Sequence, residues 1–212
     1  MIVRMLRVVM AGALLLLANG ALAQQAVPNP WYVSVGAGAA WYLDQKVTGA
    51  PAGKISTDTG YTGNVSIGRY IDDIRVVRLE LETLYSDADA NNFGGAKISG
   101  DIANLGVMLN LLYDIHTDSS WIPYIGGGIG YGHVDMNNIT QNGVTVIDGT
   151  DDTFAYQFKA GIAYQFNPSM AVTAGYRFYG TNNLSFGGQP GGTVKTDGVK
   201  VNTAELGFRF HF

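Results

Sequence analysis

The last nine residues of the chain decide its fold class, and they read Ala204-Glu205-Leu206-Gly207-Phe208-Arg209-Phe210-His211-Phe212. Every second residue is apolar, and the residues between are charged, polar or glycine, which is the two-residue period of a β-strand. One face of this strand is therefore apolar and the other ionic. In a water-soluble sandwich the apolar face points into a core, whereas in a transmembrane barrel it faces lipid. The rest of the chain has to decide between these two arrangements.

The same alternation recurs along the chain. Its clearest copy is 153–166, where Phe154, Phe158 and Ile162 share one face and Gln157 and Lys159 share the other. Apolar and polar residues that alternate in this way indicate a strand with two different environments. We expect eight such strands, at 31–43, 58–70, 75–87, 97–113, 121–134, 153–166, 170–180 and 204–212.

The connections between these segments alternate in length. Short ones fall at 71–74, 114–120 and 167–169, and longer ones rich in Gly, Asn, Asp and Thr fall at 44–57, 88–96, 135–151 and 181–198. Short periplasmic turns and longer external loops are typical of outer-membrane barrels, whose tilted strands need about 9–11 residues to cross. The sequence therefore predicts an all-β fold, an eight-stranded antiparallel up-and-down transmembrane β-barrel. A soluble β-sandwich is the alternative.

Aromatic residues on the apolar faces form two bands, as expected for rings at the two membrane interfaces. We assign the periplasmic band to Trp31, Tyr113, Trp121, Tyr164, Phe166, Phe210 and Phe212. We assign the external band to Trp41, Tyr61, Tyr85, Tyr131, Phe154 and Tyr156.

The start of the chain predicts export. Two arginines precede an uncharged apolar run over 8–18, and the small-residue sequence Ala21-Leu22-Ala23 follows. This order predicts a signal peptide of residues 1–23 that is cleaved, followed by a barrel domain of residues 24–212. The chain has no cysteine, which excludes disulfides and thiolate metal sites. Its formal net charge of −4 gives no basic footprint for nucleic acid.

Two segments carry a resemblance to a known family. They are Pro123-Tyr124-Ile125-Gly126-Gly127-Gly128-Ile129-Gly130-Tyr131-Gly132 and the stretch 154–180, together with the terminal Phe212. They resemble the small outer-membrane β-barrel superfamily of OmpA transmembrane domains, opacity-type proteins and rickettsial-type surface antigens. The resemblance covers about residues 31–212. It implies an outer-membrane location, contact with lipid and lipopolysaccharide, and recognition of Phe212 by the barrel-assembly machinery.

The polar faces carry charges that a narrow barrel must pair, because an unpaired buried charge is costly. We expect a network in the lumen of Arg78, Glu80, Glu82, Lys159, Arg177, Glu205 and Arg209. Counted from the strand ends, Glu82, Lys159, Arg177 and Glu205 fall in one layer, although strand stagger can shift them. Glycines 126, 128, 130 and 132 leave room either for side chains of neighbouring strands or for water. An eight-stranded barrel is just wide enough for side chains to fill it, so we predict a plugged lumen.

The sequence shows no catalytic set, cofactor motif or metal cluster. The histidines, His116, His133 and His211, are dispersed along the predicted barrel, and we expect Asp135 to lie near His133. Asp148, Asp151 and Asp152 fall in a predicted loop, where solvation is the simpler interpretation and cation binding the alternative.

Three functions remain open at this point. The leading hypothesis is a structural, surface-exposed protein, adhesin- or antigen-like and not an enzyme, that binds a host or surface ligand through the four longer loops. The second is a small porin-like channel. The third is a lipid-modifying enzyme that uses His133.

Overall fold

The computed structural model describes residues 30–48, 53–71, 73–93, 95–141, 144–188 and 192–212. The predicted signal peptide lies outside these residues. The described residues contain no helix long and apolar enough to cross a membrane.

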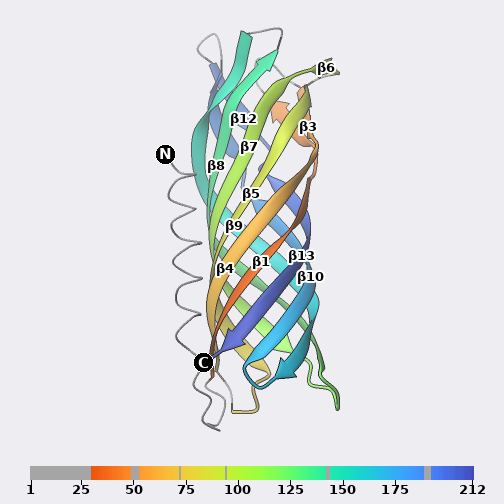
Figure 1. The fold of residues 1–212 in the computed structure, drawn as a ribbon. Coiled ribbons are helices and arrows are strands. Elements are labelled where there is room, and N and C mark those ends of the chain that lie inside the picture. The colour runs from red at the N-terminus through yellow and green to blue at the C-terminus, as the bar shows by residue number, and fades with distance from the viewer. Residues whose placement is uncertain (1–29, 49–52, 72, 94, 142–143, 189–191) are drawn as a thin grey trace.

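Eight long strands make up the wall of the molecule (Figure 1). They are β1 (Trp31–Tyr42), β4 (Thr59–Tyr70), β5 (Val77–Phe93), β7 (Ser99–Asp114), β8 (Trp121–Gln141), β9 (Val144–Asn167), β10 (Met170–Thr181) and β13 (Lys200–His211). Each pairs antiparallel with the next, and β13 returns to β1. Val35, for example, lies between Phe208 on one side and Val65 on the other. The ring is closed, which confirms the predicted eight-stranded up-and-down barrel.

The four longer connections are largely β-structure, and their prediction as loops was wrong. Five short strands lie in or beside them: β2 (Gln45–Thr48), β3 (Gly53–Thr57), β6 (Ala96–Lys97), β11 (Leu184–Gly188) and β12 (Gly192–Thr196). In the connection 135–151, β8 and β9 continue as one hairpin with Ile139 opposite Ile147. Polar composition concealed these strands, because Gly, Asn and Asp, which are frequent in them, are depleted in strands generally.

These extensions form a single structure at one end of the barrel, which we call the crown. It consists of β2, β3, β6, β11 and β12 with residues 86–93 of β5, 99–104 of β7, 133–141 of β8 and 144–153 of β9. Its strands keep the circular order of the barrel, since β2 pairs with β3 and β12, β3 with β5, and β11 with β12 and β9. In Figure 1 the crown lies at the upper end and the C-terminus at the lower end.

The outer face of the barrel is apolar between two bands of rings. Leu206, Phe158 and Ile129 are 68%, 63% and 59% exposed in the isolated chain. Trp31, Tyr113, Trp121, Phe166 and Phe212 are exposed near the short turns, and Trp41, Tyr61, Tyr131 and Phe154 are exposed toward the crown. The apolar faces of the strands therefore point outward, as the alternation predicts.

The interior has two parts of different polarity, whereas the sequence predicted polar contents throughout. The half near the short turns holds the charged side chains. The half near the crown holds a hydrophobic core of Ala40, Tyr42, Ile55, Leu84, Ala88, Ala90, Ile98, Ile102, Met108, Val134, Met136, Ile139, Ala155, Tyr179, Leu184, Val199 and Val201. The inward positions become apolar there because the crown strands, paired above the barrel, pack against one another as in a soluble protein.

Candidate functional site

The predicted residues of the charged interior lie at inward positions on four strands. Arg78, Glu80 and Glu82 follow one another at every second residue of β5, so all three point inward and are buried. Lys159 on β9 and Arg177 on β10 are also buried. Glu205 and Arg209 complete the set from β13, where the Glu205 side chain is 10% exposed.

Glu82 is the centre of the part nearest the crown. Its carboxylate lies 2.5 Å from Arg177 Nη2 and 3.0 Å from Lys159 Nζ. Arg177 Nη2 also lies 2.8 Å from Glu205 Oε2. The structure thus brings into contact the four residues that the sequence places in one layer.

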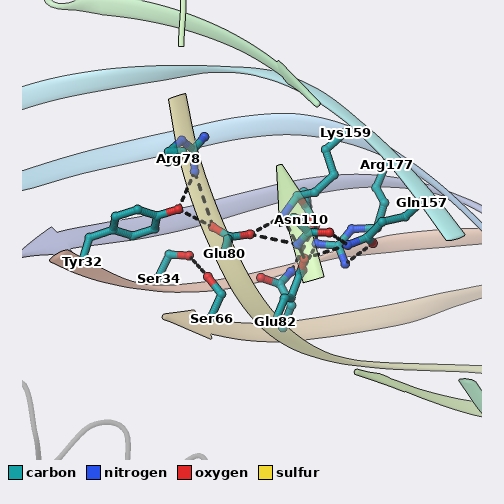
Figure 2. A network of polar contacts seen from close by, with 12 residues as sticks. Tyr32, Ser34, Ser66, Arg78, Glu80, Glu82, Asn110, Gln157, Lys159 and Arg177 are labelled. Carbon is teal, nitrogen blue, oxygen red and sulfur yellow. Dashed lines mark hydrogen bonds and ion pairs between the residues drawn. The ribbon is translucent and has the colours of Figure 1, made fainter. Parts of the chain in front are cut away.

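Glu80 joins this part to the next. Its Oε1 lies 3.1 Å from Lys159 Nζ, and its Oε2 lies 3.4 Å from Arg78 Nη1. The Tyr32 hydroxyl donates a hydrogen bond of 2.8 Å to the same Oε2. Figure 2 shows Glu80 between Tyr32 and Arg78 on one side and Asn110 on the other.

Asp114 forms the end of the network nearest the short turns, and sequence reasoning missed it. Its carboxylate lies 2.9 Å from Arg78 Nε and 3.5 Å from Arg209 Nη1, and it accepts a 2.6 Å hydrogen bond from Tyr70. The sequence assigned Asp114 to a turn. In the structure it is the last residue of β7, two residues after the inward-facing Leu112, so it also points inward. With Asp114 added, the four cations of this network face four carboxylates.

Neutral side chains add hydrogen bonds to the network, while Arg78 Nη2 and Arg177 Nε are buried without a hydrogen-bond partner among the described residues. Asn110 Nδ2 donates to Glu82 Oε2 at 2.7 Å and to Glu80 Oε1 at 3.2 Å. Gln157 Nε2 donates to the same Glu82 oxygen at 2.9 Å, and Gln157 Oε1 accepts from Arg177 Nη1 at 3.3 Å. A substitution at Gln157 is therefore expected to be costly, because a buried polar network tolerates few unpaired atoms.

Two tyrosine rings lie beside the two arginines nearest the short turns. The guanidinium carbons of Arg78 and Arg209 lie 5.5 and 5.2 Å from the Tyr32 ring centre. They lie 5.1 and 5.9 Å from the centre of Tyr124. These distances allow cation–π attraction, which is stronger where water is excluded.

The charged half is packed and has little free space. A cavity of about 30 Å³ borders Ser34, Arg78, Glu205 and Arg209. A buried water needs roughly 10–15 Å³ of such space, so this cavity has room for about two water molecules rather than a hydrated solute. The space beside Gly128 is filled, since a Cβ placed there would collide with Asn110 Oδ1. This glycine therefore admits a neighbouring side chain.

The three histidines lie apart. His116 is exposed in a short turn, and His211 is buried against the Tyr70 ring, with centroids 5.9 Å apart. His133 Nδ1 lies 2.5 Å from Asp152 Oδ1. The expected neighbour Asp135 is not this partner, because the strand register places Asp152 directly opposite His133.

Metal ligands do not gather in the part of the chain that the structure describes, where no three His, Cys, Asp or Glu side chains are placed to hold one ion. Asp151 accepts a hydrogen bond from the backbone of Ser185, while the side chain of Asp148 lies outside the described residues. Phe212 is 53% exposed beside the short turns, and its role in assembly stays a prediction.

Comparison with known proteins decides what kind of barrel this is. The family model described as outer membrane protein beta-barrel domain matches residues 11–212. The chain belongs to this family. It is accordingly an outer-membrane β-barrel protein, located in a lipid environment, and its exposed apolar belt faces hydrocarbon.

Two curated proteins are similar to this outer-membrane barrel. Major surface antigen 4 of Anaplasma marginale is 37% identical over 131 residues, which are 57% of this chain and 43% of that protein. Outer membrane protein PagN of Salmonella typhimurium is 28% identical over 144 residues, 59% of each chain. The chain thus spans about half the length of these relatives.

A solved structure agrees on the fold. The outer membrane protein OprG from Pseudomonas aeruginosa superposes with a TM-score of 0.62 at 17% identity, covering 90% of this chain and all of that one, 100%. At this identity the likeness concerns the architecture alone.

Proposed function

We propose that this outer-membrane barrel is a structural protein that presents its crown at the cell surface for contact with other surfaces, and that it is not an enzyme. The observation that carries the proposal is the crown itself. Ile102, Val134 and Met136 are fully buried in it, so the external ends of the strands form a packed structure with its own core. A rigid, surface-presented structure suits recognition, because little conformational entropy is lost on binding.

Over β5, β7 and β8 the outer face of the crown is acidic. Asp87 and Asp89 on β5, Asp101 on β7 and Asp135 on β8 alternate with buried apolar residues and therefore point outward. Asp89 and Asp101 are direct cross-strand partners. We infer that the crown contacts surfaces carrying positive charge, since complementary charge guides encounter.

Polar contacts also hold the base of the crown. Lys54 on β3 lies 2.6 Å from Asp44, in the link between β1 and β2. The hydrogen bond from Lys54 lowers the pKa of the Asp44 carboxyl. Because both side chains are exposed, this pair positions the link and adds little to stability.

The proposal extends to export, membrane assembly and the lumen of the barrel. The signal peptide of residues 1–23 is removed on export, and the barrel-assembly machinery reads the exposed Phe212. Lipopolysaccharide surrounds the external ring band. The lumen residues from Arg78 to Arg209 hold the wall together and do not form a path for solutes.

An enzymatic role finds little support in the site. The pair His133–Asp152 resembles a base with its orienting carboxylate. Nucleophilic catalysis also needs a hydroxyl or thiol beside the base. The described hydrogen bond of His133 leads to Asp152 and not to a serine or threonine. Surface antigen 4, the relative noted above, is named for its place at the surface, which agrees with a presenting role.

Replacing Asp89 and Asp101 together by serine tests the role of the crown. We expect cells that display this variant to bind positively charged surfaces, such as polylysine-coated glass, several-fold less than cells that display the wild type. The barrel should stay folded, because both side chains are exposed. Adhesion counts, normalised to the amount of displayed protein, measure the effect.

The matched control changes two acids at the opposite end, Asp73 and Asp118, both exposed beside the short turns. This variant should adhere like the wild type. Equal losses in the two variants would show that net charge, and not the crown, governs adhesion. Unchanged adhesion of the crown variant would refute the acidic face as the contact surface.

A further inference from the structure

A groove interrupts the lipid-facing side of the barrel. Its volume is about 360 Å³, and it lies over β5, β7, β8 and β9. Most of the residues that line it are apolar, among them Leu79, Leu109, Leu111, Ile129 and Phe158, and Tyr156, Asn110 and Gln157 border it as well. A depression of this size in a belt of large side chains needs a structural cause.

The cause is one glycine on the outer face. The strand register places Leu79, Leu111, Gly127 and Phe158 side by side in one row across four strands. Leu111 is 53% exposed and Phe158 63%, so both project from the wall, while Gly127 between them has no side chain. The row therefore has a notch, and the residues above and below it on neighbouring strands extend the notch into a groove.

The position of the notch along β8 places it inside the bilayer. Gly127 follows Trp121, in the periplasmic ring band, and precedes Tyr131, in the external band. The groove is thus continuous with the surface that faces hydrocarbon. If this space were empty, the side chains that line it would lose van der Waals contacts on one side. The surrounding lipid can supply those contacts.

We propose that this groove binds one acyl chain of a phospholipid from the periplasmic leaflet. An apolar lining selects hydrocarbon. The groove runs from Leu79 and Leu111, near the ends of β5 and β7 at the short turns, to Tyr156 in the external ring band, so a chain anchored in the periplasmic leaflet can enter it from the short-turn side. On the same strands the outer face beyond the external ring band carries Asp87 and Asp135, which disfavour the phosphate groups of lipid A on the other side.

Retention of lipid by purified protein tests the proposal. Wild type and Gly127→Leu are extracted from outer membranes in mild detergent and examined by native mass spectrometry. The wild type should keep a phospholipid that Gly127→Leu, whose new side chain fills the groove, loses. In phosphatidylcholine vesicles containing a chain-labelled nitroxide phosphatidylcholine, the variant should immobilise fewer chains per protein, by about one.

Ala37→Leu is the matched control, because Ala37 is exposed on the outer face of β1, away from the groove. It should retain lipid like the wild type. Phe158→Ala, which removes one wall, serves if Gly127→Leu does not fold, and it should also lose the lipid.

Three results would overturn the proposal. Equal retention of phospholipid by the wild type and the groove variants would mean that the groove has no specific site for an acyl chain. Retention of lipid A in place of phospholipid would mean that the groove binds an acyl chain from the external leaflet. A wild-type dimer that Gly127→Leu makes monomeric would mean that Phe158 of a second copy occupies the notch.

Discussion

Replacing Glu82 by alanine is expected to lower the free energy of unfolding by about 3–5 kcal/mol. Glu82 is fully buried. It forms ion pairs with Arg177 and Lys159 and accepts hydrogen bonds from Asn110 and Gln157. Its removal leaves buried donors without their acceptor, and breaking one side of a buried ion pair costs more than the pair contributes. Urea unfolding in lipid vesicles, followed by tryptophan fluorescence, measures the change.

Two further variants separate charge from packing. The double variant Glu82→Ala with Arg177→Met should recover part of the loss, because it removes the stranded cation as well. Glu205→Ala should cost less free energy than Glu82→Ala. Arg177 still has its ion pair with Glu82 in that variant, and the Glu205 side chain is partly exposed to begin with. A Glu82→Ala protein within about 1 kcal/mol of the wild type would contradict the view that this network holds the barrel.

Replacing Leu206 by arginine is expected to cost about 2–4 kcal/mol. Leu206 lies in the middle of β13, is 68% exposed in the isolated chain, and faces outward beside Ala37 and Ala174. Arginine there must place its charge in hydrocarbon. The same unfolding measurement applies.

The control for this variant is an arginine outside the bilayer. Thr150 is exposed in the crown, and Thr150→Arg should change stability by less than about 0.5 kcal/mol. If Leu206→Arg were equally mild, the outer face at Leu206 would be in contact with water and the assignment of the belt would fail.

The sequence was sufficient to predict the barrel, because a two-residue period shows which side chains point outward and which inward, as well as which segments are strands. Once Leu206 and Phe208 are assigned outward, Glu205 and Arg209 must point inward, and the same logic places Arg78, Glu80 and Glu82 together. The period also accounts for Asp114. It lies in phase with Leu112 and Asn110, so a strand that ends at residue 114 instead of 113 brings it to the cations.

The crown was not predictable in the same way. Segments such as 135–151 look like loops because Asn, Asp and Gly are frequent in them, yet pairing and a shared core make them strands. The segment 135–151 folds back on itself as a hairpin, and other crown strands pair with partners that are distant in sequence, as for Lys195 opposite Thr48. The partner of His133 illustrates the limit: Asp135 is near in sequence, whereas strand register brings Asp152 into contact.

The division of the interior explains why we assign the function to the surface. On the path from the short turns to the crown, a solute meets first the ion pairs that run from Asp114 to Glu82 and then the buried side chains of Met108, Leu84 and Ile102. The first layer is charged and fully paired, and the second is apolar and packed. Neither layer offers a hydrated route.

Single-channel recording of refolded protein in planar bilayers tests this account most directly. A barrel whose ionic half is paired and whose crown half is filled with apolar side chains should give no large, steady conductance. A stable open level in most insertions would mean that water fills the interior, and the protein would then be a channel rather than a presenting structure.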